Sequence, residues 1–159
     1  MKSLLLALVM LMAALVATVT HAGTAINTNG STDAVAIMGY DSVEFFIRKK
    51  AVKGSPDHSY QWAGAKWTFI NQENLQKFKE DPERWAPQYG GHCALGMAEG
   101  SISTKPTSGD FAIVDNKLYL FPFGSGGGSA SSGWARYRKF NIIAGDKNWP
   151  NKKIELESK

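Results

Sequence analysis

Three side chains that can bind a soft metal ion lie close together in the sequence: His92, Cys93 and Met97. Imidazole, thiolate and thioether groups together suit copper(I). If the residues after Cys93 form a helix, Cys93 and Met97 share one face because they are four residues apart, and His92 points about a quarter turn away or more. We therefore expect a metal site centred on Cys93, with copper as the metal and His92 and Met97 as further ligands.

Zinc is a weaker prediction for the same segment. A structural zinc site usually has four strong ligands, whereas this segment supplies one thiol and one imidazole. The missing ligands would have to come from elsewhere in the chain, and the candidates are Asp41, Asp110 and His58.

Two other hypotheses remain open for Cys93, the only cysteine. The flexible Gly90-Gly91 pair before it could expose a helix N-terminus, which would lower the pKa of the thiol and make it redox-active or nucleophilic. Alternatively, tryptophans and tyrosines around this pair could bind a small ligand or a protein without any role for the thiol. The segment offers neither a well-placed base nor a resolving cysteine, so a non-catalytic binding protein is favoured over an enzyme.

The N-terminus has the pattern of an export signal. Lys2 precedes an apolar run over residues 3–19, and Thr20-His21-Ala22 supplies small residues at the expected cleavage positions. The run is short for a membrane span and a polar segment follows it. We expect cleavage near Ala22, a periplasmic or secreted protein, and no stable membrane anchor after cleavage.

The charge pattern gives no indication of nucleic-acid binding. The chain has 159 residues and a formal net charge of +4, and its lysines and arginines are scattered among acidic residues. Proteins that bind nucleic acid usually gather basic residues in a patch or a run. The expected partner is therefore a metal ion or a small ligand, and the sequence identifies no protein partner.

The first half of the chain shows two helix starts and one hairpin. Asp41 is a typical N-cap residue, and Glu44 completes a capping-box pattern with it. Aromatic residues alternate on both sides of Ala63-Gly64, which predicts a β-hairpin over residues 60–70. Asn71 is the expected N-cap of the next helix.

The second half predicts another hairpin and a helix. The hairpin covers residues 111–121 and turns at Asp115-Asn116, a pair that tolerates positive φ. Residues 124–133 have the composition of a flexible Gly-rich linker. The amphipathic pattern that begins at Trp134 predicts a helix that ends at Gly145, a favourable residue after a helix C-terminus.

These elements predict an α+β fold of small antiparallel hairpins packed with short helices. The 137 residues that remain after cleavage suit one domain with its own core. The expected organisation is a signal peptide over residues 1–22, a mobile polar spacer over 23–33, a folded domain over 34–150 and a charged tail over 151–159.

Several short motifs, taken in order, resemble exported bacterial YHS-domain proteins. The similarity covers most of residues 34–150 and rests on the following residues: Ala36-Ile37-Met38-Gly39-Tyr40-Asp41, Lys53-Gly54-Ser55, Trp67-Thr68-Phe69, Asn74, Phe78, Asp81-Pro82, Ala86-Pro87-Gln88-Tyr89-Gly90-Gly91-His92-Cys93-Ala94, Ile113-Val114-Asp115, Lys117-Leu118-Tyr119-Leu120 and Asn148-Trp149-Pro150.

The resemblance implies a small α+β module that binds metal in some members of the family. Those members use a Phe-Cys-Ser-x-x-Cys pattern, which falls here on residues 69–74. Ile70 and Asn74 occupy the two thiol positions, and neither can replace a thiolate. The metal function of that site is therefore not carried over. The exported subgroup shares the motif over residues 89–94, in which His92 stands where a typical member has tyrosine.

Overall fold

A computed structural model describes residues 23–29, 31–103, 107–122 and 130–159. The predicted signal peptide and residues 124–129 of the predicted linker lie outside the described residues. In chain order, the elements are η1 (Ala36–Gly39), α2 (Ser42–Ile47), β1 (Ser55–Trp62), β2 (Ala65–Phe69), α3 (Gln72–Glu80), α4 (Pro82–Trp85), η2 (Gln88–Gly91), α5 (Ala94–Ala98), β3 (Thr107–Val114), β4 (Lys117–Pro122), α6 (Ala130–Arg136) and α7 (Arg138–Glu157).

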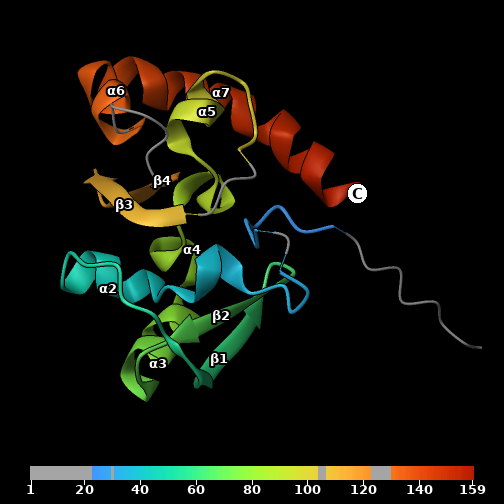
Figure 1. The fold of residues 1–159 in the computed structure, drawn as a ribbon, viewed down its shortest axis with the longest axis vertical. Coiled ribbons are helices and arrows are strands. Elements are labelled where there is room, and N and C mark those ends of the chain that lie inside the picture. The colour runs from blue at the N-terminus through green and yellow to red at the C-terminus, as the bar shows by residue number, and fades with distance from the viewer. Residues whose placement is uncertain (1–22, 30, 104–106, 123–129) are drawn as a thin grey trace, which may run out of the picture.

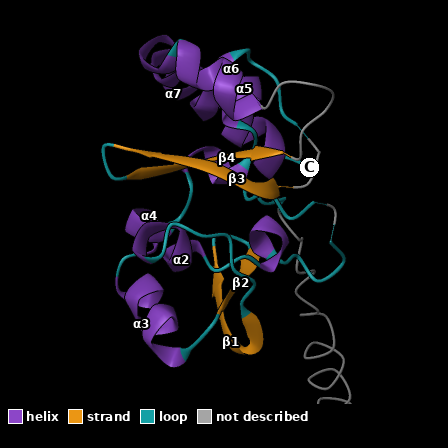
Figure 2. Cartoon of the chain, turned by 60° about the vertical axis from the view of Figure 1, so that its left-hand side comes forward, coloured by secondary structure: helices purple, strands orange, loops and turns teal. Residues whose placement is uncertain are grey.

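The described strands form two antiparallel hairpins, and the α+β prediction is confirmed at this level. Figure 1 shows the β1–β2 hairpin with α2 and α3 at one end of the molecule and α5, α6 and α7 at the other. The β3–β4 hairpin lies between these two groups, as the rotated view in Figure 2 also shows.

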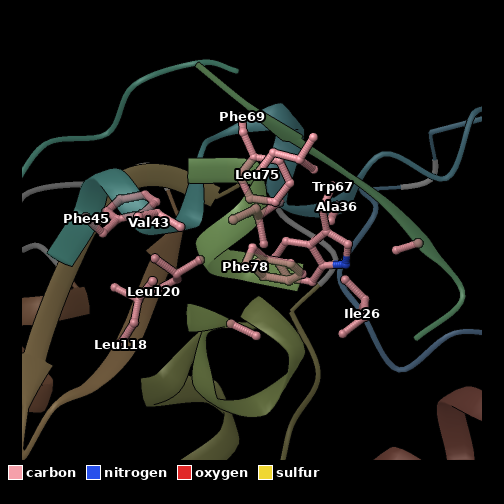
Figure 3. Packing of buried hydrophobic residues seen from close by; sticks show 13 residues of the cluster. Ile26, Ala36, Val43, Phe45, Trp67, Phe69, Leu75, Phe78, Leu118 and Leu120 are labelled. Atoms are coloured by element: carbon pink, nitrogen blue, oxygen red, sulfur yellow. The ribbon is translucent and has the colours of Figure 1, made fainter. Parts of the chain in front are cut away.

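Strand β4 joins two hydrophobic clusters because successive side chains of a strand point to opposite faces. Leu118 and Leu120 belong to the first cluster, and Tyr119 and Phe121 belong to the second. Figure 3 shows Leu118 and Leu120 near Val43 and Phe45 of α2. Because β4 contributes buried side chains to both clusters, it connects the two ends of the domain.

The first cluster is built mainly of aromatic and aliphatic side chains from the β1–β2 hairpin, α2 and α3. The ring of Phe78 lies 4.9 Å from that of Trp67 and 5.0 Å from that of Phe69, centroid to centroid. Phe45 makes an edge-to-face contact with Phe111 of β3 at 4.9 Å. Aromatic pairs in these geometries stabilise a core beyond the area that they bury.

Local sequence signals explain where several elements begin. The side chain of Asp41 accepts a hydrogen bond from Val43 N at 2.9 Å, and that of Asn71 accepts one from Asn74 N at 2.8 Å. Both helix starts are thus confirmed. The capping box is not formed, because Asp41 N donates to the carbonyl of Val52 and the Glu44 carboxylate binds Asn74 and Arg48 instead.

Both predicted hairpin turns are confirmed. Ala63 and Gly64 have φ values of 51° and 76°, and Asp115 and Asn116 have 48° and 63°. Two consecutive residues with positive φ match the right-handed twist of the flanking strands, which is why such pairs are common in tight hairpins.

The segment predicted as a mobile spacer is partly a core element. Ala25, Ile26 and Asn27 are buried. Asn27 N donates to the carbonyl of Gly90 at 2.8 Å, and its side-chain amide donates to that of Gly91 at 3.3 Å. The folded unit therefore begins before residue 34.

The C-terminal prediction is also corrected, because α7 runs through Gly145 and Pro150 to Glu157. Gly145 is required for close packing: a Cβ there would lie 2.5 Å from the hydroxyl oxygen of Tyr89. The residues predicted as a charged tail are largely helical, and ion pairs such as Lys153 with Glu157 at 3.8 Å support the last turns.

The Gly-rich segment is helical where the structure describes it, because α6 begins at Ala130 and includes Gly133. Among the described residues, no helix combines the length and the apolar character that crossing a bilayer requires.

Candidate functional site

The Tyr-Gly-Gly motif forms a tight turn in η2 (Gln88–Gly91). Tyr89, Gly90 and Gly91 have φ values of 56°, 60° and 83°, a left-handed conformation that favours glycine. A Cβ on Gly90 would lie 2.1 Å from the carbonyl oxygen of Ala25, and one on Gly91 would lie 2.5 Å from Cγ2 of Ile37. The two glycines therefore allow close packing against Ala25 and Ile37.

Cys93 is the N-cap of the short helix α5 and is only 9% exposed. Its sulfur accepts a hydrogen bond from Gly96 N at 3.5 Å. Burial raises the pKa of the thiol, and the amides of Gly96 and Leu95 offset only part of this effect. The lowered pKa that the redox hypothesis requires is thus contradicted, because desolvation outweighs the favourable helix start.

Met97 lies one turn further along α5, and its amide donates to the carbonyl of Cys93 at 2.9 Å. Its side chain is completely buried in the second cluster, which also contains Cys93, Tyr119 and Trp134. The two sulfur atoms thus belong to the same water-poor cluster. A thioether in contact with aromatic rings contributes to packing whether or not it binds a metal.

His92 is 6% exposed, and its ring lies 6.4 Å from that of Trp149 on α7. Its Nδ1 is 3.4 Å from the carbonyl oxygen of Ser103. Burial lowers the pKa of the imidazole, although the nearby backbones of Ser103 and Ala25 act in the opposite direction. We assign the hydrogen of the neutral ring to Nδ1, because a carbonyl can only accept.

This assignment leaves Nε2 of His92 as a hydrogen-bond acceptor. Within the part of the chain that the structure describes, Nε2 has no hydrogen-bond partner. The backbone of Ala25 also interacts with the ring and favours its charged form. A buried polar atom in this state is unfavourable unless something else binds it.

The structure places Cys93 and Met97 in the second cluster, and His92 against Trp149, a partly buried ring that packs on the same cluster. His92 also lines a cavity beside α7. Across the described ranges, no group of three or more His, Cys, Asp and Glu residues is close enough to hold a metal ion. Asp41, a candidate zinc ligand, instead caps α2 and binds Asn74.

Comparisons of the chain with protein-family models, curated proteins and solved structures gave no match.

A cavity of about 660 Å³ lies against the other side of the Tyr-Gly-Gly turn. We call it the aromatic cavity. Trp62 and Trp149 line it together with buried Ile26, Tyr89 and Gly90. Its volume is within the range of about 300–1,000 Å³ that is usual for small-molecule sites.

Neighbouring rings fix the tryptophans of the aromatic cavity. Trp62 packs edge-to-face on Phe78 at 5.7 Å, and Trp149 packs on Tyr89 at 6.1 Å. The hydroxyl of Tyr89 donates to Asp146 at 3.0 Å. The surplus of tryptophans was the one sequence signal for this site, but no local pattern indicated that Trp62 and Trp149 line the same cavity.

The charged residues that line the aromatic cavity have mixed signs. Lys153 and Glu157 of α7 form an ion pair at 3.8 Å, and Glu83 of α4 is a second carboxylate. All three are exposed or nearly so, which places charge at the mouth and apolar surface inside. This distribution suits a ligand with an apolar body and a polar end.

Proposed function

We propose that this chain is an exported, non-enzymatic binding protein of the YHS type that recognises a small, flat and largely apolar molecule in the aromatic cavity. The observation that carries the proposal is the 660 Å³ cavity lined by Trp62 and Trp149 over a buried floor. Flat rings offer a large apolar contact area with little loss of side-chain freedom.

Hydrogen bonds that hold the floor of the cavity support a binding role. Gly90 receives the hydrogen bond from Asn27, and Tyr89 is tied to α7 through Asp146. A cavity that is formed before the ligand arrives binds with a smaller ordering cost. Cys93 keeps its proton because burial raises the pKa of the thiol, which favours recognition over nucleophilic chemistry.

Replacing Trp149 with alanine is expected to weaken binding in the aromatic cavity at least about tenfold, because one ring surface is lost. N-phenyl-1-naphthylamine, a neutral flat dye, is a suitable probe, and its fluorescence increase on titration gives the dissociation constant. Phe140→Ala is the matched control, since Phe140 lies on the same helix but is 71% exposed. Equal affinity of the wild type and Trp149→Ala would contradict the proposal.

Soft-metal binding at Cys93, His92 and Met97 is the second candidate. The observation that favours it is the placement of Cys93 and Met97 on consecutive turns within one water-poor cluster. Two sulfur ligands shielded from water suit copper(I). Binding would require the thiol proton to leave, which costs free energy at a site where burial already raises the pKa of the thiol.

Under this second candidate, reduced protein purified without oxygen retains copper(I) against a moderate chelator. Cys93→Ser and Met97→Leu then lose the metal, because each removes a sulfur ligand. Met38→Leu is the control, since Met38 is an exposed methionine in η1. Measured copper contents that are as low in the wild type as in Cys93→Ser would exclude this function. Dye binding in Cys93→Ser should be unchanged, which separates the two candidates.

A further inference from the structure

Helix α7 carries large apolar side chains on its solvent side. Six large hydrophobic residues are exposed within the described ranges, and four of them belong to α7 or to its N-cap. These four are Tyr137, Phe140, Ile143 and Ile154, which are 64%, 71%, 60% and 66% exposed. A surface helix normally presents polar side chains to water. Apolar residues gathered on one exposed helix indicate a surface that a partner covers.

The exposed apolar residues of α7 share one face. Phe140 and Ile143 are three positions apart and are therefore neighbours on the helix surface. Ile154 follows Ile143 by eleven positions, which is close to three full turns. The buried residues Asn141 and Gly145 lie on the opposite face of the helix. We call the exposed side the outer face of α7. Figures 1 and 2 show α6 and α7 at the end of the molecule that is farthest from β1 and α3.

Basic side chains surround the first half of this outer face. Arg136, Arg138, Lys139 and Lys147 are all exposed. Residues 130–147 contain one acidic residue, Asp146, so the segment has four cations, one carboxylate and a net charge of +3. Apolar side chains ringed by cations are complementary to a partner that is both apolar and negatively charged.

This charge pattern decides between the possible partners. Two copies that paired through this face would bring the same four cations together, and like charges across an interface weaken association. Phe140, Ile143 and Ile154 line neither the aromatic cavity nor the cavity beside α7. An anionic lipid bilayer needs no such cavity, because its acyl chains take up apolar side chains and its headgroups bind lysine and arginine.

We propose that the outer face of α7 binds reversibly to the surface of a bilayer that contains anionic lipid. The helix lies in the plane of the surface. Phe140 and Ile143 enter the boundary between headgroups and acyl chains, and Lys139 and Lys147 lie at the lipid phosphates. Tyr137 lies at the same level, where the amphipathic ring of tyrosine is favoured. This surface is separate from the aromatic cavity and does not depend on what that cavity binds.

Co-sedimentation with lipid vesicles tests the proposal. Vesicles of equal parts phosphatidylglycerol and phosphatidylcholine are expected to bind the protein at least about tenfold more tightly than vesicles of phosphatidylcholine alone, at low ionic strength. Added salt should weaken the binding, because it screens the cations. All proteins are compared in the same processed form, checked by intact mass, so that the apolar run at residues 3–19 contributes equally to each. Equal binding to both kinds of vesicle, or no binding, overturns the proposal.

An apolar variant shows whether side chains enter the bilayer. Phe140→Ser combined with Ile143→Ser is expected to weaken vesicle binding at least about tenfold, because the inserted apolar area is lost. Both residues are exposed, so the variant should fold, and thermal unfolding checks this. Ile47→Ser is the control, since Ile47 is 50% exposed at the end of α2 and is followed by three basic residues. Wild-type affinity of the double variant would refute insertion.

A charge variant locates the headgroup contacts. Lys139→Gln combined with Lys147→Gln should weaken binding to anionic vesicles roughly twentyfold, since each cation near the surface contributes about fivefold. Lys49→Gln combined with Lys50→Gln removes two exposed lysines from the other end of the molecule and is the matched control. Equal losses in the two variants would show that the overall charge of the protein attracts the lipid, and would refute this location.

Sedimentation velocity without lipid tests a second copy as the partner. A monomer is expected, and a dimer that the Phe140→Ser and Ile143→Ser variant dissociates would overturn the proposal. Dye binding in the aromatic cavity should be the same in all these variants. Loss of vesicle binding alone therefore leaves the proposed function standing.

Discussion

Replacing Gly90 with alanine is expected to lower the free energy of unfolding by about 3 kcal/mol and to detach residues 25–27 from the domain. The left-handed conformation, with φ of 60°, costs an alanine about 1–2 kcal/mol. The new Cβ would also lie 2.1 Å from the carbonyl oxygen of Ala25, and such overpacking typically costs about 1–3 kcal/mol. Urea unfolding measures the loss of stability.

Hydrogen exchange at the Asn27 amide shows whether the segment detaches, because this amide donates to Gly90. Gly100→Ala is the matched control. Gly100 also has a left-handed φ, of 76°, but a Cβ there would meet only Nδ2 of Asn148 at 3.7 Å, an ordinary contact. If both variants lost the same stability, close packing of Gly90 on Ala25 would be disproved. The Gly90 variant should also lose dye binding, since Gly90 lines the aromatic cavity.

Replacing Asp41 with alanine is expected to destabilise the domain by about 3 kcal/mol. The buried carboxylate accepts hydrogen bonds from Val43 N, Ile70 N and the amide of Asn74, at 2.8–2.9 Å. Loss of the cap costs about 1 kcal/mol, and a buried donor left without a partner costs about 1–3 kcal/mol. Burial raises the pKa of Asp41, so removing the charge regains part of its desolvation cost and limits the total.

Asp81→Ala separates the network from the cap. Asp81 also caps a helix, accepting from Arg84 N at 3.1 Å, but it is exposed and its cap hydrogen bond is local to α4. This control should lose about 1 kcal/mol. Thermal unfolding of both variants gives the comparison, and equal losses would show that the bonds to Ile70 and Asn74 contribute nothing beyond capping.

The elements predicted correctly are those that depend on a few neighbouring residues. The helix starts at Asp41 and Asn71 require only a short polar side chain before a helix, and the turn at Asp115-Asn116 requires only residues that tolerate positive φ. The incorrect predictions involve residues whose role depends on distant partners. Gly145 has the composition of a helix end, but it is a packing site for Tyr89, 56 positions earlier in the chain.

The candidate site shows the same division. The sequence predicted a metal site in the segment from Tyr89 to Met97, which stays a prediction, and the structure places Tyr89 and His92 in the linings of two cavities. It did not indicate that α7 would continue past Pro150 and bring Trp149, Lys152 and Lys153 to these cavities. Proline is unfavourable inside a helix. Local rules therefore predict that a helix ends near Pro150, and they give no reason for α7 to continue.

By itself, the amino-acid sequence determined the α+β class, the hairpin turns and the helix starts, because these follow from the backbone preferences of adjacent residues. Only the tertiary structure decided that the thiol of Cys93 is buried with a raised pKa, that residues 25–27 are part of the core, and that two cavities flank that segment. The physical reason is that burial and cavity shape are set by contacts between residues far apart in the chain, which no local pattern encodes.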